Sequence, residues 1–299
     1  MPEAELHPPL LVRLALGLER RLSGLQYRRV TVGEHEIHYL ERNPERAETL
    51  LLVHGFGADK DNWVRFVRHL GPLRKSLRIV SLDLPGFGDS TRLPEAPYDI
   101  PTQAERLHAF AETLEFGPLH LIGSSMGGGI AGRFAARYPE LVKSLCLIEP
   151  LALHGAEPST LDQLQEQHEN PLVAETPEGF EALLDFVFEK RPLLPGFLRH
   201  FLARRAVHYR DHLARVWTQI WDDLPEPLAG HLEAIRAPTL LLWGDTNRVF
   251  HLTVMEAMKR RLPQATSHVF VGCGHLPMVE RPRETAQWYR EWVDTIYDV

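Results

Sequence analysis

Short apolar runs separated by longer amphipathic stretches dominate the hydrophobic pattern of this chain. Runs of this length that are bounded by Gly, Pro or Ser are too short for ordinary helices and predict buried strands. Before them, residues 27–42 alternate around Gly33-Glu34 and predict an antiparallel hairpin. The predicted buried strands are residues 49–53, 77–82, 119–122, 142–148, 239–243 and 267–271.

Helical patterns lie between these strands. The alternation of strand and helix is typical of a parallel sheet covered by helices on both faces. After residue 150 it stops, and residues 154–231 show helical spacing alone. We therefore expect an α/β fold with a mostly parallel eight-stranded sheet, in which residues 27–153 and 232–299 form the core and residues 154–231 form a helical cap inserted after the sixth strand. The predicted core helices are residues 61–70, 102–114, 126–137, 252–262 and 282–297.

Residues 1–26 are predicted to form a separate amphipathic helical extension. Five leucines fall on one face of it at helical spacing. In one interpretation this stripe packs on the body of the protein. In the other, residues 10–25 make peripheral contact with a membrane, with the arginines of the helix toward lipid head groups. The leucines are Leu11, Leu14, Leu18, Leu22 and Leu25.

Composition narrows the classes of partner and location. The formal charge of -7 and the pI of about 6.1 give no reason to expect nucleic acid as a partner, since its phosphates select for clustered Lys and Arg. Two cysteines, Cys146 and Cys273, predict no disulfide framework. Residues 1–9 lack a basic leader segment, and no run reaches the roughly 20 apolar residues of a membrane span. We expect a cytoplasmic location, with or without peripheral membrane contact.

The sharpest local signal is Gly123-Ser124-Ser125-Met126-Gly127. It directly follows a predicted buried strand and directly precedes a predicted helix. Glycines two residues on either side of Ser125 permit a tight, strained turn that lifts the hydroxyl from the end of the strand onto a helix N-terminus. Ser125 is therefore predicted to be an exposed nucleophile.

A serine hydroxyl is a weak nucleophile near neutral pH and needs a base within hydrogen-bond reach. His275 is the candidate, because it follows Gly272-Cys273-Gly274 after the last predicted strand, at the carboxyl edge of the sheet. Acyl transfer also needs N–H donors aimed at the developing oxyanion. The backbone amides of Phe56, in the turn His54-Gly55-Phe56-Gly57, and of Met126 are the expected pair.

Taken in order, these segments resemble the α/β-hydrolases over about residues 27–297. Ser-Met-Gly-Gly after the turn and Glu280-Arg281-Pro282 after His275 are similar to the branch of monoacylglycerol lipases and esterases, which includes bacterial lipases and their membrane-associated animal relatives. The resemblance implies a Ser-His-acid triad and needs no metal or organic cofactor. The segments that carry it are His54-Gly55-Phe56-Gly57 with Trp63, residues 83–90, residues 123–128, Trp243-Gly244-Asp245 and Gly274-His275.

The acid of the triad is where the sequence departs from this family. The family acid usually stands three residues after the glycine of Trp-Gly, and here that position is Asn247. An amide cannot supply the negative charge that stabilises an imidazolium. Three explanations stay open. Glu149, at the end of the strand over residues 142–148, supplies the acid, as in certain haloalkane dehalogenases; Asp245 supplies it; or the triad is impaired.

We expect a serine hydrolase that cleaves a carboxylic ester through an acyl-enzyme, an esterase or lipase related to monoacylglycerol lipases. The alternatives are a carbon–carbon bond hydrolase with the same triad and a ligand-binding protein of this fold that has lost turnover. The expected partner is a small-molecule ester with an apolar acyl chain, under a cap rich in aromatic side chains. These are Phe180, Phe186, Phe188, Phe197, Phe201, Tyr209, Trp217 and Trp221.

Overall fold

One eight-stranded sheet lies at the centre of the computed structural model, which describes residues 6–221 and 226–297. The strand order is β1-β2-β4-β3-β5-β6-β7-β8; β2 pairs antiparallel with β1 and β4, and the other neighbours are parallel. The predicted fold class and its mostly parallel sheet are confirmed. The strands are β1 (Gln26–Val32), β2 (His35–Arg42), β3 (Thr49–Val53), β4 (Arg78–Leu82), β5 (Leu119–Ser124), β6 (Val142–Ile148), β7 (Thr239–Gly244) and β8 (Thr266–Phe270).

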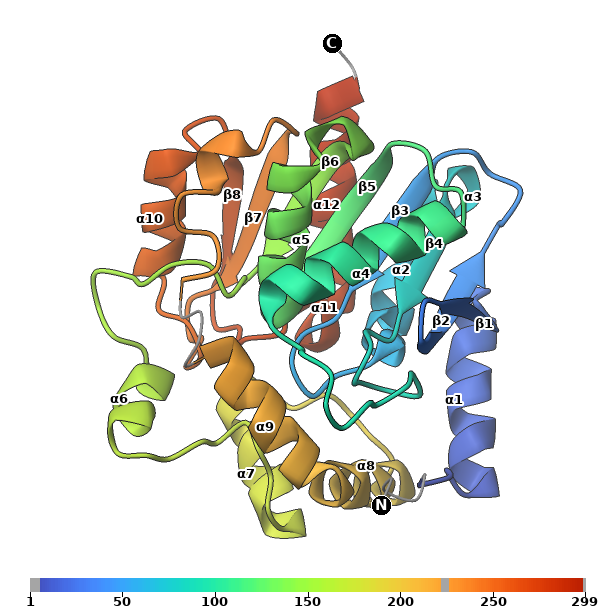
Figure 1. The fold of residues 1–299 in the computed structure, drawn as a ribbon, viewed down its shortest axis with the longest axis vertical. Helices are drawn as coiled ribbons and strands as arrows, with labels where there is room; N and C mark the ends of the chain where they lie inside the picture. Colours follow the sequence, from blue (N-terminus) through green and yellow to red (C-terminus); the bar gives the residue numbers. More distant parts are fainter. Residues whose placement is uncertain (1–5, 222–225, 298–299) are drawn as a thin grey trace.

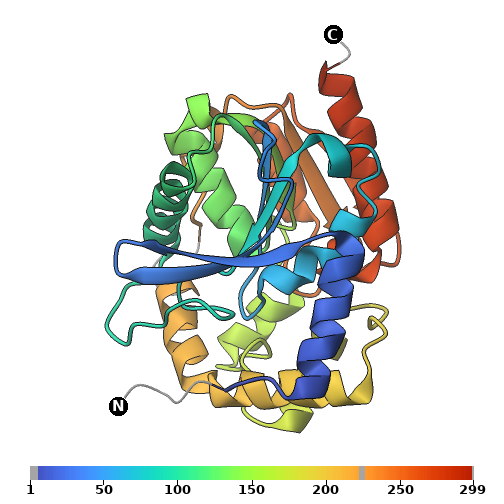
Figure 2. The ribbon, with the colours of Figure 1, turned by 90° about the vertical axis from the view of Figure 1, so that its right-hand side faces the viewer.

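Helices cover both faces of this sheet (Figures 1 and 2). The face formed by Leu51 and Val53 packs on α4, α5 and α10, and the face formed by Leu50 and Leu52 packs on α2, α11 and α12. Burial of both faces explains why the central strands are apolar without alternation. The helices of this layer are α2 (Val64–Arg68), α3 (Leu73–Ser76), α4 (Ile100–Thr113), α5 (Met126–Arg137), α10 (Thr253–Arg261), α11 (Pro277–Glu280) and α12 (Pro282–Tyr297).

Among the described residues between β6 and β7, four α-helices lie within the segment predicted to be the cap. They stand beyond the carboxyl ends of the central strands (Figure 1). Phe180, Leu184 and Trp217 are buried in the same cluster as the sheet residues, so the core continues from the sheet into these helices. The domain boundaries remain a prediction. The cap helices are α6 (Thr160–Glu166), α7 (Pro177–Val187), α8 (Gly196–His208) and α9 (Arg210–Trp221).

The N-terminal helix α1 (Leu10–Ser23) packs on α2 and α8, but not through the predicted leucine stripe. The side that packs carries Val12, which is buried against α8, and Ser23, whose hydroxyl donates to the carbonyl oxygen of Val64 at 2.5 Å. The helix therefore packs on the body, as the first interpretation expected, but mainly through the side opposite the stripe; of the five predicted leucines only Leu25 is buried. The exposed leucines are Leu10 (69%), Leu11 (56%), Leu14 (61%), Leu18 (58%) and Leu22 (51%).

The helix predicted over residues 61–70 divides in two. A 3₁₀ turn (Lys60–Trp63) comes first and α2 follows it. Asp59 accepts a hydrogen bond from the amide of Asp61 and so starts the tighter turn. This side-chain cap belongs to a buried group of charges described below.

Candidate active site

Ser125 occupies the turn between β5 and α5. Its φ of 56° and ψ of -123° lie outside the regions that most L-residues adopt. Two glycines make the turn possible: a Cβ at Gly123 would lie 2.2 Å from the carbonyl oxygen of Gly127, and a Cβ at Gly127 would lie 2.3 Å from that of His54. The turn places Ser125 at the carboxyl end of β5 and the N-terminus of a 12-residue helix. The prediction that Ser125 is exposed is wrong: the residue is 9% exposed, because the turn after β3 lies directly against it.

The glycine-rich turn after β3 lies directly against Ser125. A Cβ at Gly55 would lie 3.0 Å from the Cβ of Ser125 and 3.5 Å from its Oγ. His54 supports this turn from within: Nε2 accepts from the amide of Leu84 at 3.1 Å, so Nδ1 carries the proton and donates to the carbonyl oxygen of Gly55 at 2.8 Å. His54 is therefore engaged in holding the backbone.

The two predicted oxyanion donors adjoin Ser125 in different ways. Met126 is the first residue of α5, where backbone amides have no acceptor within the helix. Phe56 follows Gly55 in the turn after β3. Its ring makes edge contacts with Phe87 at 6.1 Å and with Trp217 of the cap helix α9 at 5.4 Å between centroids. The cap therefore helps to fix Phe56.

His275 lies between β8 and α11 and is 4% exposed. Its amide donates to the carbonyl oxygen of Val187, at the end of the cap helix α7, at 2.8 Å. The ring of Phe250 packs edge-on against the imidazole at 5.4 Å. Gly274 permits the close approach of the cap, since a Cβ there would lie 2.6 Å from the carbonyl oxygen of Val187. Both the sheet and the cap thus position the imidazole.

Glu149, directly after β6, is the carboxylate that the structure brings against His275. Its Oε2 lies 2.9 Å from Nδ1 of His275, and its Oε1 accepts from the amide of Gly244 at 2.6 Å. The side chain is fully buried, and the backbone has a φ of 47°, which few non-glycine residues adopt. Unusual backbone geometry of this kind is concentrated at functional sites.

The other two candidates for the acid make different contacts. Asp245 is exposed, and its Oδ1 accepts from the amide of Gly272 at 2.6 Å, on the loop that leads to the histidine. Asn247 donates from Nδ2 to Oε2 of Glu149. The structure thus brings Glu149, and not Asp245, against the imidazole, and Asn247 against Glu149.

Burial dominates the electrostatics of this pair. It lowers the pKa of His275 and raises the pKa of Glu149, because it disfavours the charged form of each. The amide of Gly244 lowers the pKa of Glu149. Groups that only donate, the N–H of Gly244 and the Nδ2 of Asn247, contact the two carboxylate oxygens and favour the ionised form. A neutral imidazole beside such a carboxylate can accept a proton and hold it.

A second buried polar group lies on the loop between β3 and α2, and sequence analysis missed it. Lys60 is 1% exposed, and its Nζ contacts Oδ2 of Asp83 at 2.6 Å and Oδ2 of Asp89 at 2.7 Å. Its signal in the sequence is the triple Asp59-Lys60-Asp61 beside the two aspartates of residues 83–90. We call this group the ion cluster: Arg20, Asp59, Lys60, Asp61, Asp83, Asp89 and Arg205.

The ion cluster joins three parts of the molecule. Arg20 of α1 makes two hydrogen bonds of 2.6 Å to Asp61, and Arg205 of the cap helix α8 donates to Asp59. Burial raises the pKa of Asp59, but Arg205 and Lys60 outweigh it and hold this pKa below its ordinary value. Burial likewise lowers the pKa of Lys60, and the surrounding aspartates more than reverse that shift. Three cations therefore compensate most of the charge of the four aspartates, while burial still raises the pKa of Asp61.

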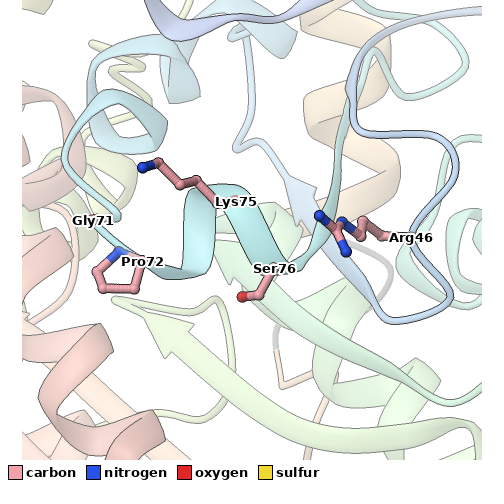
Figure 3. Close-up of a pocket in the computed structure, with 5 residues that line it drawn as sticks. All are labelled: Arg46, Gly71, Pro72, Lys75 and Ser76. Atoms are coloured by element: carbon pink, nitrogen blue, oxygen red, sulfur yellow. The ribbon is translucent and has the colours of Figure 1, made fainter.

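Neither a metal site nor the hollow in Figure 3 competes with this candidate site. Within residues 6–221 and 226–297, no group of three or more His, Cys, Asp or Glu side chains is arranged to hold a metal ion. The hollow, of about 660 Å³, is lined by Arg46, Pro72 and Lys75 among others. It adjoins α3, which leads into the start of β4, so it lies at the amino edge of the sheet, away from Ser125.

Comparison with known proteins places this arrangement in a family. A family model described as the alpha/beta hydrolase fold matches residues 48–282. Lipase 1 of Psychrobacter immobilis is 33% identical over 275 residues, which cover 91% of this chain and 85% of the lipase. Monoacylglycerol lipase ABHD6 of Homo sapiens is 29% identical over 304 residues, which cover 98% of this chain and 89% of that protein.

A solved structure described as a membrane phospholipase A, a novel bacterial virulence factor, has a TM-score of 0.93 and 46% sequence identity. The match covers 97% of this chain and 92% of that one. The region matched by the family model includes Ser125, Glu149 and His275. The resemblance predicted from the sequence motifs is confirmed: the chain belongs to the α/β-hydrolase family.

Proposed function

We propose that this chain hydrolyses lipid-like carboxylic esters through an acyl-enzyme on Ser125, with His275 as the base and Glu149 as the acid of the triad. Its relatives include a bacterial lipase and a monoacylglycerol lipase, and the chain is accordingly a lipase- or esterase-type hydrolase that acts on carboxylic esters. The 2.9 Å contact between Glu149 and His275 is the observation that supports this triad.

Topology supports this assignment. The strands β5, β6, β7 and β8 are parallel neighbours, so their carboxyl ends meet at one edge of the sheet. Ser125 follows β5, Glu149 follows β6 and His275 follows β8 by a short loop. One edge therefore carries the nucleophile, the acid and the base.

In the first half of the reaction, Nε2 of His275 takes the proton of the Ser125 hydroxyl while Oγ bonds to the ester carbonyl carbon. The carbonyl oxygen becomes an oxyanion, which the amides of Phe56 and Met126 stabilise. Glu149 stabilises the imidazolium through Nδ1. The intermediate collapses, its carbon–oxygen bond to the alcohol breaks, and His275 returns the proton to the departing alcohol.

In the second half, a water molecule gives a proton to His275 and attacks the acyl carbon. The bond to Oγ then breaks, the carboxylic acid leaves, and Ser125 regains its proton from the imidazolium. The same two amides hold the second oxyanion. The ester and one water molecule are the only reactants in the two halves.

Replacement of Ser125 by Ala is the direct test. The Ser125→Ala variant should lose hydrolysis of p-nitrophenyl butyrate and labelling by a fluorophosphonate, because both need Oγ. Ser124→Ala is a matched control, since the hydroxyl of Ser124 is buried and finds no hydrogen-bond partner in the described structure. Equal activity of the Ser125→Ala variant and the native protein would refute the assignment.

The two alternative functions predict different outcomes. A carbon–carbon bond hydrolase would cleave a ring-fission diketone in preference to short p-nitrophenyl esters. A binding protein without turnover would show no Ser125-dependent labelling. The contact of Glu149 with His275 weakens the second alternative, because its main support was the absence of an acid at position 247.

The exposed side of α1 supports contact with a lipid surface as a further part of this proposal. Leu14 and Leu18 are more than half exposed, and Arg13 and Arg21 lie exposed on the same helix. A helix with an apolar outer side and flanking arginines fits a bilayer interface. No helix in residues 6–221 and 226–297 has both the length and the apolar character needed to cross a membrane.

Flotation with vesicles of phosphatidylcholine and phosphatidylglycerol tests the lipid contact. The double variant Leu14→Glu/Leu18→Glu should float less than the native protein and should keep its rate on the water-soluble butyrate ester. Arg13→Gln/Arg21→Gln separates the electrostatic part, which salt should screen. Unchanged flotation of the leucine variant would remove α1 from the proposal.

A further inference from the structure

Asn247 makes three hydrogen bonds that fix the direction of its side chain. It lies on the loop after β7, where its Oδ1 accepts from the amide of Val249 at 2.8 Å and from the amide of Phe250 at 3.2 Å. Two backbone donors on one atom identify that atom as the oxygen, because an amide nitrogen cannot accept. Its Nδ2 must then point the other way, toward Glu149.

That nitrogen donates to Oε2 of Glu149, the same oxygen that faces Nδ1 of His275. The amide of Gly244 holds Oε1. Glu149 itself follows β6, so its carboxylate reaches across to β7 and is held there at both oxygens. With two of the three donors coming from the segment Gly244–Asn247, the end of β7 sets where the carboxylate lies.

We propose that Asn247 is a positioning residue for Glu149: in this chain the acid stands at the end of β6, and the amide that holds it stands after β7, at the position where the resemblance expects the acid. The inference rests on the proposed ester hydrolysis. Asn247 thus contributes to the site, because its N–H donates the hydrogen bond that holds the carboxylate of Glu149.

Charge explains why position 247 holds an amide rather than an acid. An aspartate there would keep the acceptor for Val249 and Phe250 but would place a second carboxylate against Glu149. Two carboxylates in contact cannot both ionise readily, so one of them binds a proton. A neutral donor at position 247 favours the ionised form of Glu149, against the burial that raises its pKa.

A set of exchange variants tests the proposal. We expect Glu149→Gln to slow ester hydrolysis by about 10⁴-fold, and Asn247→Asp to slow it by about 10–100-fold. The double variant Glu149→Gln/Asn247→Asp restores one carboxylate and one amide in the reverse order. It should be at least about tenfold faster than Glu149→Gln alone.

The pH profile separates positioning from a structural role. In Asn247→Asp, the acid limb of kcat/KM should move to higher pH, because the proton that the two carboxylates share must leave before Glu149 can fully stabilise the imidazolium. If Asn247 only holds its loop together, Asn247→Asp should lower kcat/KM without moving this limb. An unmoved limb together with a double variant no faster than Glu149→Gln would overturn the proposal.

A readout independent of turnover keeps this failure distinct from failure of the proposed function. The low-field NMR resonance of the His275 Nδ1 proton reports its hydrogen bond to Glu149. It should be present in the native protein and in Ser125→Ala, absent in Glu149→Gln, and shifted in Asn247→Asp. An unshifted resonance in Asn247→Asp contradicts the positioning role even if the protein proves to hydrolyse no ester.

Discussion

The ion cluster and the Glu149–His275 pair bury carboxylates in opposite ways. In the ion cluster, Asp59 faces Arg205 and Asp61 faces Arg20, so fixed cations compensate them. Glu149 instead receives N–H groups of Gly244 and Asn247 and the imidazole. No lysine or arginine among the described residues forms an ion pair with it. Cations compensate most of the charge of the first group, whereas hydrogen bonds from neutral donors favour the ionised form of Glu149 against its burial.

The difference teaches which buried carboxylate can act on a neighbour. A carboxylate paired with a guanidinium is already compensated by a permanent cation, and the pair serves to hold structural elements together. A carboxylate held only by neutral donors is stabilised without being neutralised. Its field remains available to a group that becomes charged during the reaction, and His275 is that group.

The largest expected effect is loss of this uncompensated charge. Glu149→Gln preserves the shape of the side chain but removes the charge that stabilises the imidazolium, so kcat/KM for a short ester should fall by about 10⁴-fold. Steady-state kinetics with p-nitrophenyl butyrate measure the change. Circular dichroism should show an unchanged fold.

Asp245→Asn is the matched control for this variant. Asp245 belongs to the neighbouring loop and accepts from the amide of Gly272, a contact that an asparagine oxygen can keep. We expect less than about a threefold change in rate, since its charge is exposed and screened. A loss as large as that of Glu149→Gln would move the acid to Asp245 and break the comparison.

The next largest effect concerns the stability of the ion cluster. Lys60→Met keeps the length of the side chain but leaves the fully buried Asp83 without its cation. Removal of one partner from a buried ion pair costs about 3–5 kcal/mol of unfolding free energy. Urea unfolding followed by tryptophan fluorescence measures this loss.

Lys143→Met removes an ion pair of the surface kind. Lys143 is 40% exposed and pairs with Glu48, so the expected loss is below about 1 kcal/mol. Equal losses in the two lysine variants would show that burial does not distinguish the two ion pairs.

Asp59 adds a dependence of stability on pH. Its folded pKa is depressed, so its contribution to the unfolding free energy is present above its unfolded pKa of about 3.9 and is lost as pH falls.

The sequence predicts the parts of the site that local spacing determines. The glycines around Ser125 predict the turn, and the strand before His275 predicts the loop that carries it. The choice among Glu149, Asp245 and Asn247 was open, because it depends on which way side chains from two strand ends point. That direction follows from the positive φ of Glu149 and from the amides that hold Asn247, neither of which leaves a periodic pattern.

Contacts between distant segments could also not be predicted from the sequence. Arg205 and Asp59 are 146 residues apart, and Arg20 and Asp61 are 41 apart. The Arg20–Asp61 pair holds one side of α1 against the body and leaves most of its leucines outward, so a pattern that predicts an amphipathic helix could not say which side would pack. Periodicity records that a face is apolar, whereas the partner of that face depends on the rest of the fold.

The smallest expected effect is a shift in the titration of His275. Burial lowers the pKa of His275, and an ionised Glu149 opposes that shift because it stabilises the imidazolium. Glu149→Gln removes the opposing charge, so the imidazole should titrate at a lower pH than in the native protein. NMR of the Cε1 proton across the pH range follows this directly. In Asp245→Asn the titration should stay in place, and an equal shift in both variants would mean that the imidazole responds to net charge rather than to the uncompensated carboxylate beside it.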